Sequence, residues 1–297
     1  MKMTGKTWVI LLVGAGALIS AFWLLQSPPL PKTEPLPKPN GYDDFLAGVK
    51  MLSGDCPDLK TATIDALAGY VASNRAALDR ARLGLSRPCR VPTERSTAYM
   101  GRHLAELAAL KQMARALAAE GRLASLANQP AAAATNYLTV IKFGLEVERG
   151  GVLIDALVAI ACESMGARQL AAEVPRLSAE QSRALLRQVE DLESGREPIE
   201  KIMEQENAWA RSQQKGITGL IERGVARWTM SSSRQKVLTK YNQECRRPLD
   251  LEASLAGRAF ELEKGRPAKD WGDLVPAYLE RIPLDPGTTN QLQFVGH

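Results

Sequence analysis

The cysteines of this 297-residue chain, Cys56, Cys89, Cys162 and Cys245, are residues whose chemistry depends on which of them the fold brings together. Four cysteines allow three complete pairings. We expect a Cys56–Cys89 disulfide, which would close a loop of about 30 residues and stabilise the fold by about 3 kcal/mol. The predicted helix between them would be about 36 Å long. The two thiols therefore meet only if the connecting loops fold back or the helix breaks, for example at Gly69.

The remaining sulfur and nitrogen ligands do not form a pattern that holds a cofactor. Cys162 lies in an apolar stretch and is expected to be a buried free thiol. The sequence has no Cys-x-x-Cys pair and no Walker or dinucleotide-binding glycine pattern. The 2 histidines are His103 and His297, too few for a histidine-rich metal site. We expect no catalytic, cofactor-binding or metal-binding residues, and we expect His103 to be a surface or capping residue.

Carboxylates offer the remaining chemistry. Glu163 followed by Ser164 is similar to the Glu-Ser pair of lytic transglycosylases, in which the glutamate is the general acid, but the aromatic and glycine-rich cleft signals of those enzymes are missing. A second group clusters on one predicted helix, where carboxylates four residues apart could bind a cation or form a solvated face, the commoner arrangement. Its members are Glu197, Glu200, Glu204 and Glu206, with Lys201 among them.

Charge and aromatic content argue against a nucleic-acid partner. Of the 38 basic residues, Lys2 and Lys6 precede the first apolar segment, which leaves 36 basic against 33 acidic groups without a concentrated run. Aromatic residues make up 5% of the chain, too few to predict a surface on which bases stack.

A membrane anchor is predicted near the N-terminus. Residues 8–25 are uncharged and mostly apolar, and as a helix they would span about 27 Å, enough to cross the hydrocarbon core. Lys2 and Lys6 before the segment place the N-terminus in the cytoplasm and the rest of the chain outside, on the periplasmic side. The alternative is a cleaved signal peptide, but the apolar run is long for one and ends without a small-x-small cleavage site. We therefore predict a single-pass signal anchor.

The predicted organisation follows from changes in composition. Residues 1–26 are the cytoplasmic tip and anchor. Prolines at positions 28, 29, 31, 35, 37 and 39 make residues 27–39 a semi-rigid linker, about 40 Å long. Residues 40–247 form a helical domain, and residues 248–297 add a helix and a proline-rich segment packed on it.

Helical periodicity dominates the region beyond the linker, so the fold class is mainly α, a multi-helix bundle or short α-solenoid. We expect helices over residues 61–85, 131–147, 152–174, 178–194, 197–213, part of 216–240 and 249–264, and one that ends near residue 126. Pro130 fits a first helical turn, and Ser178 with Gln181 forms a capping box. Gly121, Ala133 and Tyr137 are spaced like the close-packing positions of one degenerate tetratricopeptide unit, whose alternative is an ordinary antiparallel helix pair.

Three stretches carry a resemblance. The first is Asn40-Gly41-Tyr42-Asp43-Asp44-Phe45, the second is Cys89-Arg90-Val91-Pro92, and the third covers residues 273–286. Together they resemble an uncharacterised family of membrane-anchored helical proteins of planctomycete-type bacteria, which implies a topology and no activity. The stretch over residues 263–286 is also similar to the tails of pseudopilin-like proteins.

Anchor, linker and helical body together predict a membrane-tethered extracytoplasmic scaffold or protein-interaction module, more a binding protein than an enzyme. Its expected partners are the membrane, through residues 8–25, and either another protein or a second copy of the chain. One alternative is an accessory component of a secretion or pilus-like system. Another is an envelope enzyme that acts on cell-wall glycan, with Glu163 or the Glu200/Glu204 pair as the acid.

Overall fold

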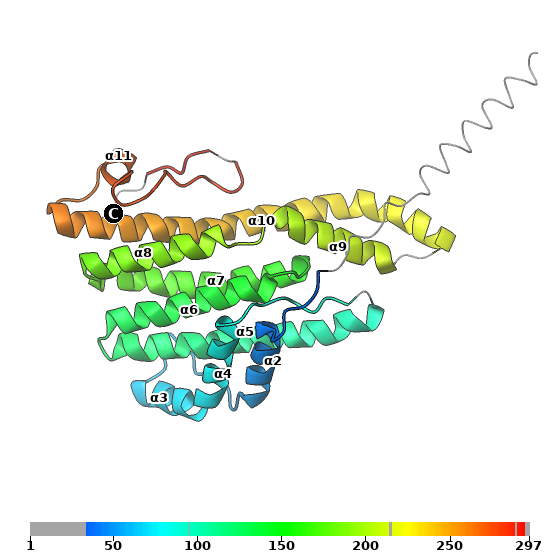
Figure 1. Ribbon diagram of the computed structural model, residues 1–297, viewed down its shortest axis with the longest axis horizontal. Coiled ribbons are helices and arrows are strands. Elements are labelled where there is room, and N and C mark those ends of the chain that lie inside the picture. Colours follow the sequence, from blue (N-terminus) through cyan, green and yellow to red (C-terminus); the bar gives the residue numbers. More distant parts are fainter. Residues whose placement is uncertain (1–33, 95, 214–215, 289, 295–297) are drawn as a thin grey trace, which may run out of the picture. The chain divides into compact units, whose positions relative to one another are not determined.

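Helices stack side by side through most of the computed structural model, which describes residues 34–94, 96–213, 216–288 and 290–294 (Figure 1). The predicted anchor, residues 8–25, and most of the predicted linker lie outside these residues. Residues 34–40 of that region form neither helix nor strand. In the described part, no helix combines the length and apolar character that crossing a bilayer requires. The prediction of a mainly helical protein is confirmed.

Three short helices precede the long ones. They are α2 (Gly41–Met51), α3 (Ile64–Ser73) and α4 (Arg75–Leu85). The expectation of one helix over residues 61–85 is therefore wrong, and the break falls at Asn74, not at Gly69. The buried Asn74 side chain accepts a hydrogen bond from Ser53 N–H at 2.8 Å and donates to the Ser53 and Tyr70 carbonyls at 3.0 and 2.9 Å. These bonds compete with a continuous helix and fix the bend.

Two of the stretches that carry the resemblance pair with each other. The Asn40 side chain donates to the Arg90 carbonyl at 2.8 Å and accepts from Arg90 N–H at 2.9 Å. The buried Asp44 forms ion pairs with Arg80 at 2.7 Å and with Arg87 at 2.6 Å. These contacts attach α2 to α4 and to the chain that follows it, so these residues serve the fold.

The long helices follow in chain order. They are α5 (Thr97–Leu126), α6 (Pro130–Glu148), α7 (Leu153–Glu173), α8 (Ala179–Ser194), α9 (Ile199–Gln213) and α10 (Gly216–Lys264), with a 3-10 turn at Val174–Arg176. Pro130 opens α6, and the Ser178–Gln181 capping box opens α8, as predicted. Gly150, with a φ of 74°, lies just beyond the end of α6, where a left-handed backbone favours glycine.

Helix α10 continues through Pro248, so the predicted domain boundary after residue 247 falls inside a helix. Proline lacks the N–H that an interior helical residue donates, so the sequence predicted two helices here. The described part after α10 contains only the short α11 (Trp271–Leu274) and an isolated bridge between Leu284 and Gln291.

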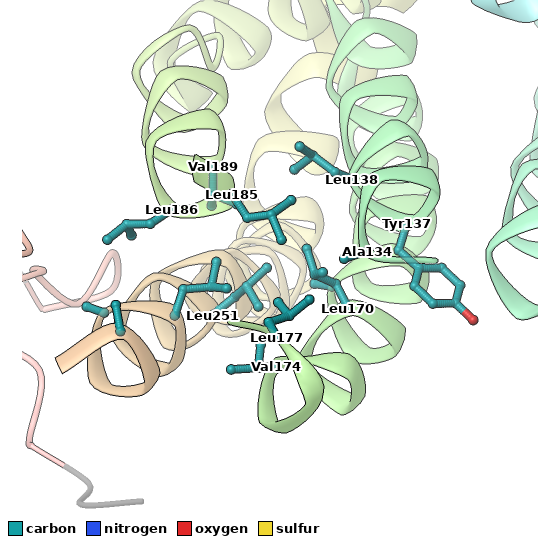
Figure 2. Packing of buried hydrophobic residues seen from close by; sticks show 14 of the residues in the cluster. Ala134, Tyr137, Leu138, Leu170, Val174, Leu177, Leu185, Leu186, Val189 and Leu251 are labelled. Atoms are coloured by element: carbon teal, nitrogen blue, oxygen red, sulfur yellow. The ribbon is translucent and has the colours of Figure 1, made fainter. Parts of the chain in front are cut away.

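The packing of α5 against α6 depends on one glycine. A Cβ at Gly121 would lie 2.5 Å from a ring carbon of Tyr137, so the ring can approach α5 only because Gly121 has no side chain. Figure 2 shows Tyr137 pointing away from the other labelled side chains of its cluster. This contact is that of a close antiparallel helix pair, and its likeness to a tetratricopeptide unit stays a prediction.

The core divides into clusters that hold successive helices together. One joins α6, α7, α8 and the C-terminal half of α10, and Figure 2 shows part of it, including Leu170, Leu185 and Leu251. A second joins α2, α4 and α5 to α6 and α7 around the Phe45–Phe143 ring pair. A smaller cluster joins Ile160 of α7, Ile202 of α9 and Tyr241 of α10. It fixes the place where α9 and α10 meet the bundle, and a polar cleft opens there.

Candidate functional site

Glu163, the candidate acid in the sequence, is enclosed within the bundle. It lies on α7 and is 3% exposed. Both its carboxylate oxygens accept hydrogen bonds from the guanidinium of Arg196, which precedes α9. A carboxylate held in this way stabilises the packing of α7 and cannot reach a polymeric glycan. The glycan-cleaving role predicted for Glu163 therefore has no geometric support.

The acidic run on α9 separates into two groups. Glu200 and Glu204 are exposed, as expected of a solvated helix face. Glu197 and Glu206 instead turn toward the start of α7, where Glu197 accepts from Gly150 N–H and Glu206 from Leu153 N–H at 3.1 Å. Because the first N–H groups of a helix lack partners within it, Glu206 caps α7 from a neighbouring helix, whereas Glu197, just before α9, binds the loop that leads into α7.

The sequence predicted that His103 is a surface or capping residue. Its side chain is instead fully buried. Its Nε2 lies 2.6 Å from Oδ1 of Asp155, its Nδ1 lies 3.4 Å from Oε2 of Glu106, and its ring stacks on Tyr99. Burial opposes the charged ring, but the hydrogen bonds that the ring donates to Asp155 and Glu106, together with the negative charges of these carboxylates, outweigh it and raise the pKa of His103. The sequence missed this pair because Asp155 is distant in the chain. The pair links α5 to α7.

All four cysteines are free in the structure, so the Cys56–Cys89 disulfide predicted from the sequence is not formed. The Cys56 thiol donates to the Arg115 carbonyl, and the Cys89 thiol donates to the Glu146 carbonyl at 3.4 Å. The two sulfurs thus contact different long helices. Cys162 is a buried free thiol, as expected, and burial raises its pKa to about 12.

A cleft of about 880 Å³ that the sequence analysis did not identify lies between α8, α9, α10 and the segment after α11. We call it the acidic cleft. Six carboxyl groups and three guanidinium groups line it. The carboxyl groups belong to Glu190, Asp191, Glu193, Glu197, Glu252 and Glu280, and the guanidinium groups to Arg187, Arg196 and Arg281. Negative charge is therefore in excess.

Glu252 on α10 is the unusual member of the cleft. It is only 7% exposed, no hydrogen bond or close ion pair joins it to a residue that the structure describes, and the charge of Arg281 favours its ionised form without outweighing burial. Burial raises its pKa to about 8, and the negative charges of Glu193 and Glu190 add to the effect. A buried carboxyl without a partner carries a large desolvation cost when it ionises, so Glu252 holds its proton at neutral pH.

Arg196 borders the cleft but is already bound by carboxylates, one of which, Glu193, also lines the cleft. Besides Glu163, it binds Glu193 at 2.8 Å and lies 3.6 Å from Glu148, which is fully buried. Neither carboxylate oxygen of Glu148 has a hydrogen bond. Burial and the nearby Glu163 raise the pKa of Glu148 well above its usual range. One guanidinium therefore serves several acids and cannot balance Glu252 as well.

Apolar and aromatic groups share the cleft with the acids. Tyr241 is 3% exposed, and its hydroxyl lacks a hydrogen-bond partner at normal geometry, its neighbour being the Cys245 thiol. Ile199, Leu249 and the half-exposed Leu284 also line the cleft. In the described part of the chain, no three acidic, histidine or cysteine side chains converge closely enough to hold a metal ion. The arrangement suits an organic cation with an apolar stem.

A second cavity, of about 590 Å³, lies between α10 and the C-terminal segment. It is lined mainly by apolar groups, including Val174, Trp271 and Phe294. Its charged residues pair with one another, for example Arg258 with Glu261 at 3.1 Å. It offers no unpartnered polar group like Glu252 to orient a ligand, so the acidic cleft is the stronger candidate site.

The cleft had a weak signal in the sequence. Tyr241, Cys245 and Glu252 are spaced by four and seven residues, which places them on one face of a helix. An acidic residue on an otherwise buried stripe indicates either a hidden partner or a site. Comparison of the chain with protein families, curated proteins and solved structures found no match, so the chemistry of the cleft is the basis for inferring function.

Proposed function

We propose that this protein is a membrane-tethered, extracytoplasmic interaction module whose acidic cleft binds a cationic segment of a partner protein. The observation that supports the proposal is Glu252, a buried carboxyl without a partner in a cleft where acids outnumber guanidinium groups. The anchor over residues 8–25 and the linker over residues 27–39 are part of the proposal, as they would hold the module outside the cytoplasm.

A lysine or arginine side chain matches the cleft in charge and in shape. Its terminal cation would supply the partner that Glu252 lacks, which converts an unfavourable buried carboxylate into an ion pair. Its methylene stem would pack on Ile199, Leu249 and Leu284. Glu190 and Glu193 at the same cleft would attract the cation before contact and favour fast association.

The proposal is tested with a fluorescent peptide of alternating Lys and Ala, titrated with the full chain in a non-ionic detergent. We expect binding that weakens with salt and strengthens from pH 6 to pH 8.5, because Glu252 must release its proton to pair with the cation. The same peptide with Glu in place of Lys should not bind.

Glu252→Gln should weaken binding of the Lys peptide at least tenfold and remove its pH dependence. Glu204→Gln, the same chemical change on the exposed face of α9, should leave binding unchanged. Equal binding by the wild type and Glu252→Gln would rule out the proposed site. The proposed topology is tested by a reporter fused after His297, and activity confined to the cytoplasm would contradict it.

Glu252 also supports a second candidate, an envelope enzyme that cleaves cell-wall glycan. A general acid must be protonated at working pH, and a carboxyl with a pKa of about 8 satisfies that condition. Glu193, on the same cleft, would be the second carboxylate. Release of soluble sugar from purified cell wall, abolished by Glu252→Gln, would favour the enzyme. No release by the wild type would exclude it.

A further inference from the structure

A cavity of about 700 Å³ between α5, α7 and α10 carries a charge opposite to that of the acidic cleft. We call it the basic cavity. Five cationic side chains and one carboxylate line it. The cations are Lys111, Arg115, Arg168, Lys240 and Arg247, and the carboxylate is Glu244.

The one carboxylate is already neutralised. Glu244 accepts hydrogen bonds from Arg247 at 2.6 Å and from the Ser164 hydroxyl at 2.7 Å, and these bonds lower its pKa. Arg247 and Glu244 therefore cancel each other in charge. Four cations remain in excess around the cavity, and of these Arg168 also acts on Glu244 through its charge.

The remaining cationic side chains are available to bind an anion. Arg115 donates to the Gln112 side chain at 3.4 Å and Arg168 to the Ser164 carbonyl at 3.1 Å, so neither is bound to a carboxylate. Lys111 and Lys240 are exposed and form no ion pair with a residue that the structure describes. Like charges held around one cavity repel each other, and an anion placed among them relieves that repulsion.

The wall behind the cations is apolar. Leu157, Ile160, Ala161 and Met165 of α7 contribute it. A free inorganic ion would leave this surface exposed to water, whereas a ligand with an apolar body would cover it. The volume lies within the range of about 300–1,000 Å³ that small-molecule sites occupy.

We propose that the basic cavity binds a small organic anion, with a phosphate or carboxylate group among Lys111, Arg115 and Arg168 and an apolar body on α7. Arginine can hold two oxygens of such a group at once, and lysine adds a mobile charge. This site is separate from the acidic cleft, since none of the residues that line one lines the other.

The test is calorimetric titration of the full chain, in detergent-matched buffer, with 1-naphthyl phosphate. Inorganic phosphate lacks the apolar body and 1-naphthalenemethanol lacks the charge, so both should bind at least tenfold more weakly. Higher salt should weaken the binding of 1-naphthyl phosphate. Equal binding of the uncharged alcohol, or no dependence on salt, would contradict an anion site.

Lys111→Glu with Arg168→Glu reverses two exposed charges at the cavity and should reduce the affinity at least tenfold. Lys50→Glu with Lys264→Glu changes the net charge equally, away from the cavity, and should bind like the wild type. Ala161→Phe fills the apolar wall and should also lose binding while the cations remain. Unchanged affinity in the double-reversal variant or in Ala161→Phe would overturn the proposal.

Discussion

Replacing Glu252 with Gln should change how the stability of the protein depends on pH. The pKa of Glu252 is about 8 in the folded chain, against an ordinary value of 4.5. At a pH between these two values, Glu252 therefore keeps its proton in the folded state but has lost it in the unfolded state. Because the proton is bound more tightly in the folded state, its contribution is complete below pH 4.5 and falls as the pH rises toward 8.

The size of the effect follows from the shift. At about 1.4 kcal/mol for each unit of pKa, raising the pH from 5 to 8 should cost the wild type about 3 kcal/mol through this residue. Glutamine has the same shape and does not titrate, so Glu252→Gln should gain little at pH 5 and about 3 kcal/mol relative to the wild type at pH 8. Because Glu252 is only 7% exposed, water screens its charge little, and this cost is not much reduced.

Urea denaturation followed by circular dichroism, at pH 5 and at pH 8, measures this difference. Glu204→Gln makes the same chemical change on an exposed face and should follow the wild type at both pH values. If the stability gain of Glu252→Gln were the same at pH 5 and pH 8, Glu252 would not be the buried, proton-holding carboxyl described above, and the reasoning for the cleft would fail with it.

Four further substitutions have outcomes set by local contacts. His103→Gln should destabilise the fold more at pH 6 than at pH 9 in thermal denaturation, because the raised pKa of His103 contributes stability below its unfolded value of 6.5 and loses it as the pH rises through the folded value. Gly121→Ala should cost about 1–3 kcal/mol through its clash with the Tyr137 ring, whereas Gly257→Ala, which meets nothing within 4 Å, should gain about 0.5–1 kcal/mol in the same assay. Asn74→Ala should cost about 2 kcal/mol in urea denaturation, and an unchanged midpoint would mean that its three hydrogen bonds do not hold the α3–α4 bend.

Local signals in the sequence predicted much of the helical framework. Pro130 and the Ser178–Gln181 box lie where two helices begin, because a proline in the first turn and a capping side chain act within a few residues. Helix α10 was split in two in the prediction because a proline rule ignores the packing that holds the helix on both sides of Pro248. Asn74 ends α3 through contacts with Ser53, distant in the chain, so no local pattern marked it.

The candidate site could not be predicted from the sequence for a related reason, since its residues are far apart in the chain. Arg196 and Glu163 are 33 residues apart, and Glu252 faces acids of α8 from the far end of α10. A single sequence lists such residues without saying which of them meet. The sequence did indicate that Tyr241 and Glu252 lie on one buried stripe of α10. Only the packing of the other helices against this stripe shows that a cleft forms there.

Three stripes of helix α10 each line a different cavity. Lys240 and Glu244 face the basic cavity, Tyr241 and Cys245 face the acidic cleft, and another stripe, from residue 246 to residue 261, faces the apolar cavity beside α11. Neighbouring residues on a helix differ in direction by about 100°. Inserting or deleting one residue here would rotate every later side chain onto the wrong cavity. Related sequences should therefore keep the length of α10 between residues 240 and 261 constant, even where residue types outside the cavities vary.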